Sequence, residues 1–359
     1  MRDRVFRNSP RTAAMLMLTF AALFPFLTLA QSATDVTVVA SGLVNPRGFT
    51  FDAENQLQVA IAGATGNTAG VAEIDDAGCP AMVVAELPSY RVVFGGPVGV
   101  ADVAVLDGGR YFLLAGGNID DGGMPNGLYR IAEGGENSLV ADVSAFIRDN
   151  PVADRPGDYD TDGQPYAMLA MGDAFWVTEG NSNQLLRLGL DGAVSRVADL
   201  SAGHPIPTGI APAPESGAYV ALFTAASYRE GAAKVLAVAA DGTVTDVWTN
   251  LTLLTDLAIG PDGALYVLEM ATGIDPDDPA SIGPGSGRVV RQTGLDTSEV
   301  VVTGLSLPVA MAFGPDGALY IAGPAFGADN GEGTIVRIEL PASGSIDISA
   351  VASPATPCS

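Results

Sequence analysis

The chain has 359 residues, of which 48% are hydrophobic, so it is long enough to bury a large core. Its 41 acidic residues outnumber the 17 basic ones, and the net charge of −24 makes nucleic acid and anionic lipid surfaces poor partners while favouring cations and neutral or basic ligands. The 44 glycines and 24 prolines indicate many tight turns, and the apolar runs between them exclude a disordered chain.

The first 30 residues have the pattern of an export signal. Four arginines within residues 1–11 precede an apolar stretch at 13–29, which ends in the small-residue exit Thr28-Leu29-Ala30. We predict cleavage near Ala30, which removes four arginines and one aspartate and lowers the net charge to −27. The protein is then secreted or extracytoplasmic, in the periplasm or outside the cell. The alternative is an uncleaved membrane anchor. We expect no membrane span after cleavage.

The rest of the chain consists of internal repeats. The heptapeptide Gly-Pro-Asp-Gly-Ala-Leu-Tyr occurs at 260–266 and again at 314–320. Weaker copies of the same region begin at Asn45, Gly96, Gln164 and Ile206, which makes six copies. Each copy has strands A and B around a tight turn, a loop of variable length, and strands C and D around a second turn. Four short strands in each repeat of about 40–50 residues are typical of a propeller blade.

We therefore predict an all-β fold over residues 35–341, a six-bladed β-propeller with four antiparallel strands per blade. The sixth copy supplies strands A, B and C, the last at 333–340, whereas "VTVVASGL" at 36–43 is a D strand without a blade of its own. The N-terminal strand is expected to complete the last blade, which closes the ring and removes the free edges. Residues 342–359 form a C-terminal tail.

The long connections all belong to the B-to-C and D-to-A classes. They fall at 117–126, 143–164, 224–232, 270–286 and 323–332. Because the strands of a blade alternate in direction, these two classes of loop project from one face of the ring, and such loops commonly carry function. Aspartates are frequent in these loops, so we predict an acidic loop face that recruits a small molecule, a cation or a protein partner.

Several motifs carry a resemblance to a known family. They are "SGLVNPRGFTF" (41–51), "DGQPYAMLA" (162–170), "VTEGNSNQLLRL" (177–188), "PTGIA" (207–211) and "DLAIGPDGALYVLE" (256–269). With them the chain resembles the ScyD/ScyE family of exported six-bladed propellers. It shares glycine-turn elements with NHL, SMP-30-like and strictosidine-synthase-like propellers. The resemblance implies the fold and export but no particular reaction. At Gln164 the family more often has asparagine, and at Leu222 it commonly has an acid.

An acidic loop follows the second repeat. Asp158, Asp160 and Asp162 alternate and are followed by Gly163, as in the first half of a calcium-binding loop. The second half does not match, because the twelfth position is Leu169 and not glutamate. The pattern leaves two interpretations open, a simple calcium loop completed by backbone carbonyls and a solvated acidic loop.

Polar residues at the ends of strands A and B form a second candidate site, at the mouth of the channel. Converging carboxylates there would hold Ca²⁺ or another divalent cation, or share a catalytic proton. The alternative is a structural plug of hydrogen-bonded carboxylates. The candidates are Glu179, Asn181, Asp256 and Glu269, with Tyr166, Asp102 and Asn118 beside them.

Three loop residues are candidates for contacting a ligand. They are Tyr228 and Arg229 in the fourth repeat and His204, the single histidine. A lone loop histidine more often caps a turn than it catalyses, and no nucleophile-elbow serine accompanies it.

The two cysteines, Cys79 and Cys358, suggest one disulfide in an exported chain. Cys79 falls in a C-to-D turn of the first blade, and the sixth blade ends on the same face before the tail reaches Cys358. A bridge would tether the tail across the ring closure. The alternative is two free thiols.

The function that these patterns favour is that of an exported, monomeric binding or scaffolding module. The alternative is a metal-dependent extracytoplasmic hydrolase or lyase, lactonase-like or strictosidine-synthase-like, with its site in the central channel.

Overall fold

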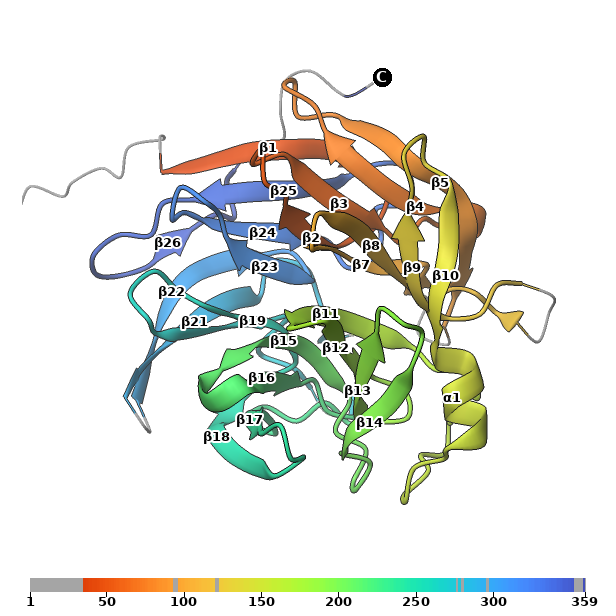
Figure 1. Cartoon of the computed structure of the whole chain (residues 1–359). Helices are drawn as coiled ribbons and strands as arrows, with labels where there is room; N and C mark the ends of the chain where they lie inside the picture. The colour runs from red at the N-terminus through yellow and green to blue at the C-terminus, as the bar shows by residue number, and fades with distance from the viewer. Residues whose placement is uncertain are drawn as a thin grey trace, which may run out of the picture. The chain divides into compact units, whose positions relative to one another are not determined.

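The computed structural model describes residues 35–92, 96–119, 123–275, 277–278, 281–294, 297–351 and 358. The predicted export signal, residues 1–30, lies outside this part of the chain. The described residues form six sheets, one for each sequence repeat, arranged as a six-bladed β-propeller (Figure 1). The predicted fold class is confirmed.

The first three blades use the chain between the first repeat and the middle of the sequence. Blade 1 contains β2 (Pro46–Phe51), β3 (Leu57–Ile61), β4 (Gly66–Ile74), β5 (Pro80–Arg91) and the short β6 (Pro97–Val98). Blade 2 contains β7 (Val100–Leu106), β8 (Gly109–Leu114), β9 (Gly127–Ile131) and β10 (Asn137–Asp142). Blade 3 contains β11 (Pro165–Met171), β12 (Ala174–Glu179), β13 (Gln184–Gly189) and β14 (Val194–Asp199).

The other three blades complete the ring. Blade 4 contains β15 (Pro207–Ala213), β16 (Gly217–Leu222), β17 (Ala233–Val238) and β18 (Val244–Leu251). Blade 5 contains β19 (Leu254–Ile259), β20 (Leu265–Glu269), β21 (Gly287–Gly294) and β22 (Thr297–Leu305). Blade 6 contains β23 (Ala310–Phe313), β24 (Leu319–Gly323), β25 (Gly333–Ile338) and β1 (Val36–Leu43).

Blade 6 joins the two ends of the propeller sequence, as predicted. The red β1 lies beside the blue β25 (Figure 1), and the two strands pair antiparallel from Val36 opposite Ile338 to Leu43 opposite Gly333. Because this pairing covers the outer edge of blade 6, the ring is closed by backbone hydrogen bonds.

Apolar side chains of neighbouring sheets fill the interfaces between blades. Both tryptophans lie in such interfaces, Trp176 between blades 3 and 4 and Trp248 between blades 4 and 5. Each is about 95% buried, with 6% and 5% of its surface exposed. The hydrophobic effect therefore contributes to holding adjacent blades together.

The two identical heptapeptides form identical turns. In blade 5, Asp262 accepts hydrogen bonds from the backbone N–H of Ala264 (3.0 Å) and the hydroxyl of Tyr266 (3.1 Å), and it pairs with Arg291 of β21. In blade 6, Asp316 makes the corresponding contacts with Ala318, Tyr320 and Arg337. The turn aspartate thus ties strands A, B and C of its blade together.

Three elements are additions to the repeat pattern. Helix α1 (Val143–Asp149) interrupts the connection between blades 2 and 3, and Asp142 caps it by accepting the N–H of Ala145 at 2.8 Å. A 3₁₀ turn (Pro214–Ser216) joins β15 to β16. In the tail, β26 (Ile346–Asp347) pairs in parallel with β22. No helix in the described part of the chain is long and apolar enough to span a membrane.

The predicted disulfide is confirmed. Cys79, in the turn between β4 and β5, is bonded to Cys358 of the tail, with the two Cα atoms 5.4 Å apart. The bond links residues 279 positions apart and attaches the tail to blade 1.

Candidate functional site

The channel mouth is built from β-bulges. The register of five A strands shifts near their first residues, in β2, β7, β11, β15 and β19. A bulge leaves a residue outside the ladder and re-aims its side chain. The residues at these shifts all border a cavity on the axis of the ring: Arg47, Ala101, Tyr166, Thr208 and Thr255.

Two cavities lie along the channel. One, the channel cavity of about 400 Å³, is lined by A-strand residues, including Asp102 and Asp256. The other lies at the loop face and is called the funnel; it has about 290 Å³ and is bounded by B-to-C and D-to-A loops. Both cavities are lined by Arg47, Ala101, Tyr166 and Val309. These four residues therefore form a septum between the funnel and the channel cavity.

Contacts across the ring fix the septum in place. Arg47 donates from Nη1 to the carbonyls of Ala325 (2.6 Å) and Pro46 (3.1 Å), and from Nη2 to the carbonyl of Pro97 (2.6 Å). Burial lowers the pKa of Arg47 to about 10, so the guanidinium stays charged at neutral pH.

Tyr166 reaches from blade 3 to blade 6. Its hydroxyl donates to the carbonyl of Val309 at 3.4 Å. Burial raises the pKa of Tyr166 although Arg47 lies close enough to oppose that shift, so the phenol is neutral at pH 7. The septum consequently presents one positive charge and one neutral hydroxyl.

The walls of the funnel are mainly apolar. They include Phe223, Met270 and Phe326 from three B-to-C segments. The polar groups Gln164, Asn181, His204 and Asp158 lie along one side, on the loops flanking blade 3. Concave apolar surfaces with a few placed polar groups are the usual form of small-molecule sites.

A hydrogen-bond network orients His204. Asn183 Oδ1 accepts the N–H of Ile206 (2.7 Å), so its Nδ2 faces the carbonyl of Asn181 (2.9 Å) and Nδ1 of His204 (2.6 Å). Because Asn183 donates to it, Nδ1 is the acceptor and the ring proton of neutral His204 lies on Nε2. That nitrogen lies 3.4 Å from Asp158 Oδ1. His204 therefore offers its Nε2–H to the acidic side of the funnel.

Glu179 does not face either cavity. Its Oε1 accepts the backbone N–H groups of Gln164 (2.5 Å) and Asn181 (3.1 Å), and its Oε2 accepts the N–H (2.7 Å) and hydroxyl of Ser182. The side chain is fully buried, and burial raises its pKa while these hydrogen bonds oppose the shift. Glu179 thus clamps two loops behind the funnel wall.

Glu269 is engaged in a similar way in blade 5. It accepts the N–H of Thr252 at 2.8 Å and forms an ion pair with Arg288. Burial raises its pKa, and Arg288 opposes that shift. The structure therefore places Asn181 at the funnel, Asp256 at the channel cavity and Tyr166 at the septum between them. Neither cavity is lined by the two glutamates. The predicted channel-mouth residues do not form one site.

Asp102 and Asp256 make matching contacts in the channel cavity. Asp102 accepts the N–H of Val103 and that of Met168 on the next blade, both at 2.8 Å. Asp256 accepts the N–H of Leu257 (2.8 Å) and that of Met311 on the next blade (2.7 Å). Burial raises the pKa of Asp102 to about 7 and that of Asp256 to about 8.

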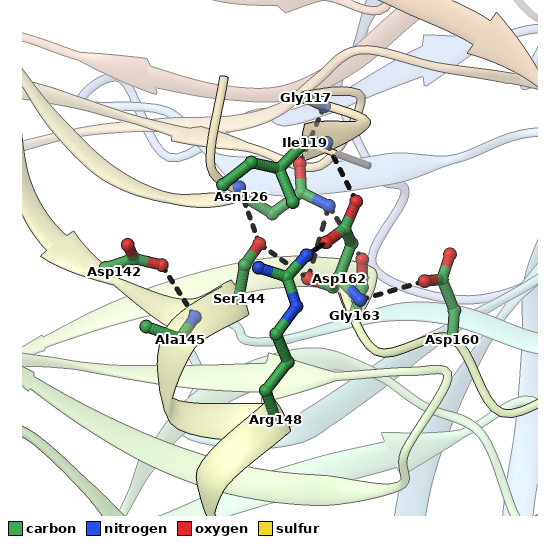
Figure 2. A network of polar contacts seen from close by, with 10 residues as sticks. All are labelled: Gly117, Ile119, Asn126, Asp142, Ser144, Ala145, Arg148, Asp160, Asp162 and Gly163. Atoms are coloured by element: carbon green, nitrogen blue, oxygen red, sulfur yellow. Dashed lines mark hydrogen bonds and ion pairs between the residues drawn. The ribbon is translucent and has the colours of Figure 1, made fainter. Parts of the chain in front are cut away.

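The three aspartates of the predicted calcium loop point to different partners. Asp162 is buried, pairs with Arg148 of α1 and accepts the N–H of Ile119 at 2.8 Å (Figure 2). Asp160 accepts the N–H of Asp162 at 2.8 Å, and Asp158 faces His204. No three His, Cys, Asp or Glu side chains in the described part of the chain are grouped to hold a metal ion. The calcium loop stays a prediction.

Asn126 and Ser144 hold the same loop by its backbone (Figure 2). Asn126 donates to the carbonyl of Gly163 at 2.8 Å, and Ser144 donates to the carbonyl of Asp162 at 3.0 Å. The loop is thereby fixed against blade 2, and its contacts are those of a structural connection.

The remaining predicted contact residues lie outside the funnel lining. The ring of Tyr228 packs edge-on against Phe223, with centroids 5.8 Å apart, and so supports the funnel wall. Arg229 is exposed. The sequence reasoning missed Arg47, although it occupies the same A-strand position as Tyr166, and an alignment of the six copies at this position would have indicated it.

Comparison with known proteins supports the fold. No family model and no curated protein matches the chain. Among solved structures, a putative glucose dehydrogenase from Thermus thermophilus is 16% identical with a TM-score of 0.58, over 85% of this chain and 99% of that one. A gluconolactonase from Xanthomonas campestris is 14% identical with a TM-score of 0.53, over 85% and 89%. A streptogramin B lyase is 16% identical with a TM-score of 0.50, over 85% and 97%.

These likenesses, together with the six sheets, define the class of the protein: a six-bladed β-propeller with an apolar funnel at one end of its channel. At such identities the likeness shows the fold alone. Membership of the ScyD/ScyE family stays a prediction.

Proposed function

We propose that this chain is an exported binding module that recruits a small molecule in the funnel. The observation that carries the proposal is the funnel itself, a cavity of about 290 Å³ with mainly apolar walls that Arg47 and Tyr166 close on the side of the channel cavity. An apolar body buried there would gain hydrophobic free energy, and the polar groups beside it would set its orientation.

The contacts of the two glutamates favour binding over hydrolysis. Glu179 and Glu269 are buried and engaged with backbone N–H groups, Ser182 and Arg288. Such contacts fit structural carboxylates.

The alternative is a lactonase-like or strictosidine-synthase-like hydrolase or lyase that works in the channel cavity. It draws support from Asp102 and Asp256, which line that cavity and whose pKa values burial raises to about 7 and about 8. Carboxyls that titrate near neutral pH suit proton transfer.

Export is part of the same proposal. The disulfide fits an oxidising compartment, and the resemblance to the ScyD/ScyE family implies the same location. We propose the periplasm or the cell exterior as the site of function.

Binding of the neutral fluorescent dye N-phenylnaphthylamine to the purified protein tests the proposal. Phe326→Ala removes part of the funnel wall and should weaken dye binding about fivefold, which corresponds to roughly 1 kcal/mol of lost apolar contact. Met82→Ala, which truncates an exposed side chain (47%) outside the funnel, should leave binding unchanged.

Two results would overturn the proposal: no dye binding to the wild-type protein, or equal binding by Phe326→Ala and the wild type. Lactone hydrolysis that Asp256→Asn abolishes would favour the enzyme instead.

A further inference from the structure

We infer that the funnel selects an organic monocarboxylate and that Arg47 binds its carboxylate group. The inference rests on the proposed binding function and adds the chemical class of the ligand. It comes from the one charged group of the septum and from the groups that surround it.

Arg47 keeps hydrogen-bond donors for a ligand. A guanidinium has five N–H groups. Three of them donate to the carbonyls of Pro46, Pro97 and Ala325, and the other two have no acceptor among the described residues. No carboxylate in the described part of the chain accepts from Arg47. The three carbonyls hold the plane of the guanidinium in place, so a bound carboxylate would meet a preorganised donor.

Among the described arginines without a carboxylate partner, Arg130, Arg155 and Arg229 are exposed, whereas Arg47 is not. Carboxylates pair with the following arginines: Arg91, Arg110, Arg148, Arg187, Arg288, Arg291 and Arg337. Arg47 is half-buried, and burial lowers its pKa to about 10. A cation withdrawn from water is costly unless an anion compensates it. Tyr166 beside it cannot supply the negative charge, because burial raises the pKa of the phenol.

The acidic surface does not cancel this local charge. The net charge of −24 repels anions at long range. At an ionic strength of about 0.15 M, however, exposed charges are screened beyond about 8 Å, whereas a buried pair is screened much less. The septum cation therefore dominates for a ligand that has entered the funnel.

The funnel also limits the ligand to one acid group. Phe223, Met270 and Phe326 require an apolar body above the carboxylate. Asp158 lies on the rim with 70% of its side chain exposed, so a second carboxylate there would meet a like charge. The volume of about 290 Å³ suits a small aromatic or alicyclic acid.

The experiment compares naphthoate with naphthalenemethanol, two ligands with one ring system and different head groups, as competitors of N-phenylnaphthylamine. The wild-type protein should bind naphthoate more tightly than the alcohol. Arg47→Gln should weaken naphthoate about 10-fold to 100-fold, since a hydrogen bond to a charged group is lost, and should leave the alcohol nearly unchanged. Arg130→Gln removes an exposed arginine outside both cavities as the matched charge control and should change neither.

Arg47→Lys guards against a variant that does not fold. This variant keeps the positive charge but loses the forked donor geometry of the guanidinium. It should still bind naphthoate more tightly than naphthalenemethanol, by a smaller factor than the wild type. The inference is overturned if the dye binds in the funnel but the wild type binds both competitors equally. It is also overturned if Arg47→Gln weakens both competitors alike. Absence of dye binding would instead overturn the proposed function itself.

Discussion

Glu179 provides a direct test of whether the buried carboxylates are structural. Glu179→Gln keeps the size of the side chain but replaces one acceptor oxygen with an amide NH₂. In the wild-type protein, Oε2 of Glu179 accepts both the N–H and the hydroxyl of Ser182, and Oε1 accepts the N–H groups of Gln164 and Asn181. Whichever oxygen is lost, at least one buried backbone N–H is left without an acceptor.

The magnitude follows from these contacts. One unsatisfied buried donor costs about 1–3 kcal/mol, and the remaining hydrogen bonds lose the strength that a charged acceptor gives them. We therefore expect Glu179→Gln to lower the free energy of unfolding by about 2–4 kcal/mol. Urea unfolding followed by tryptophan fluorescence measures this change, because Trp176 is on the same strand, β12.

The control is a carboxylate with equal chemistry and little burial. Asp173 pairs with Arg187 at 2.8 Å with 87% of its side chain exposed, so Asp173→Asn should change stability by less than about 0.5 kcal/mol. If Glu179→Gln lowers the free energy of unfolding as little as Asp173→Asn does, the carboxylate of Glu179 is not a structural clamp, and that result would favour a chemical role for it.

The other predictions concern pH and the disulfide. Burial raises the pKa values of Asp102 and Asp256 to about 7 and about 8, so the folded state holds protons that the unfolded chain has released. The free energy of unfolding should therefore fall as pH rises from 5 to 8. The slope should reach up to about 1.4 kcal/mol per pH unit for each group. Asp256→Asn should show a shallower fall in the same urea titrations, and parallel curves would contradict this origin. Replacing Cys79 and Cys358 together with serine should lower the free energy of unfolding by about 2–5 kcal/mol, because the bridge closes a long loop in the unfolded chain. Insensitivity of the wild-type protein to reductant in denaturant titrations would contradict that contribution.

The fold was predictable because each repeat carries its own local signals. The turn heptapeptide at 260–266 and 314–320, the alternation of apolar strands and the unpaired strand at 36–43 all indicated six blades with a shared last blade. The disulfide followed from the same placement of strands. Helix α1 was missed because seven residues are too few to show a helical period.

The candidate site was less predictable because long-range contacts decide what a side chain does. Asp158, Asp160 and Asp162 alternate as calcium ligands would, yet Asp162 pairs with Arg148 of α1 and Asp158 faces His204. In the sequence, Arg47 is part of the motif at 41–51, and nothing in that motif indicates a binding role for it. Its position in the septum depends on a bulge and on carbonyls from two other segments of the ring, which no local pattern reports.

The channel cavity and the funnel differ in how completely their polar groups are satisfied. In the channel cavity, Gly48 stands beside Asp102, and Gly209 stands beside Asp256; a Cβ atom there would lie 2.0 Å and 2.4 Å from the carboxylate oxygens. The glycines leave room for each aspartate to join its own blade to the next, so these carboxyls are engaged in holding neighbouring blades together. One step above, Arg47 joins only neutral carbonyls. Carboxyls that are hydrogen-bonded to two blades stabilise the fold, whereas a held but uncompensated cation can still gain free energy from a ligand. That difference is the physical reason to look for the ligand above the septum and not below it.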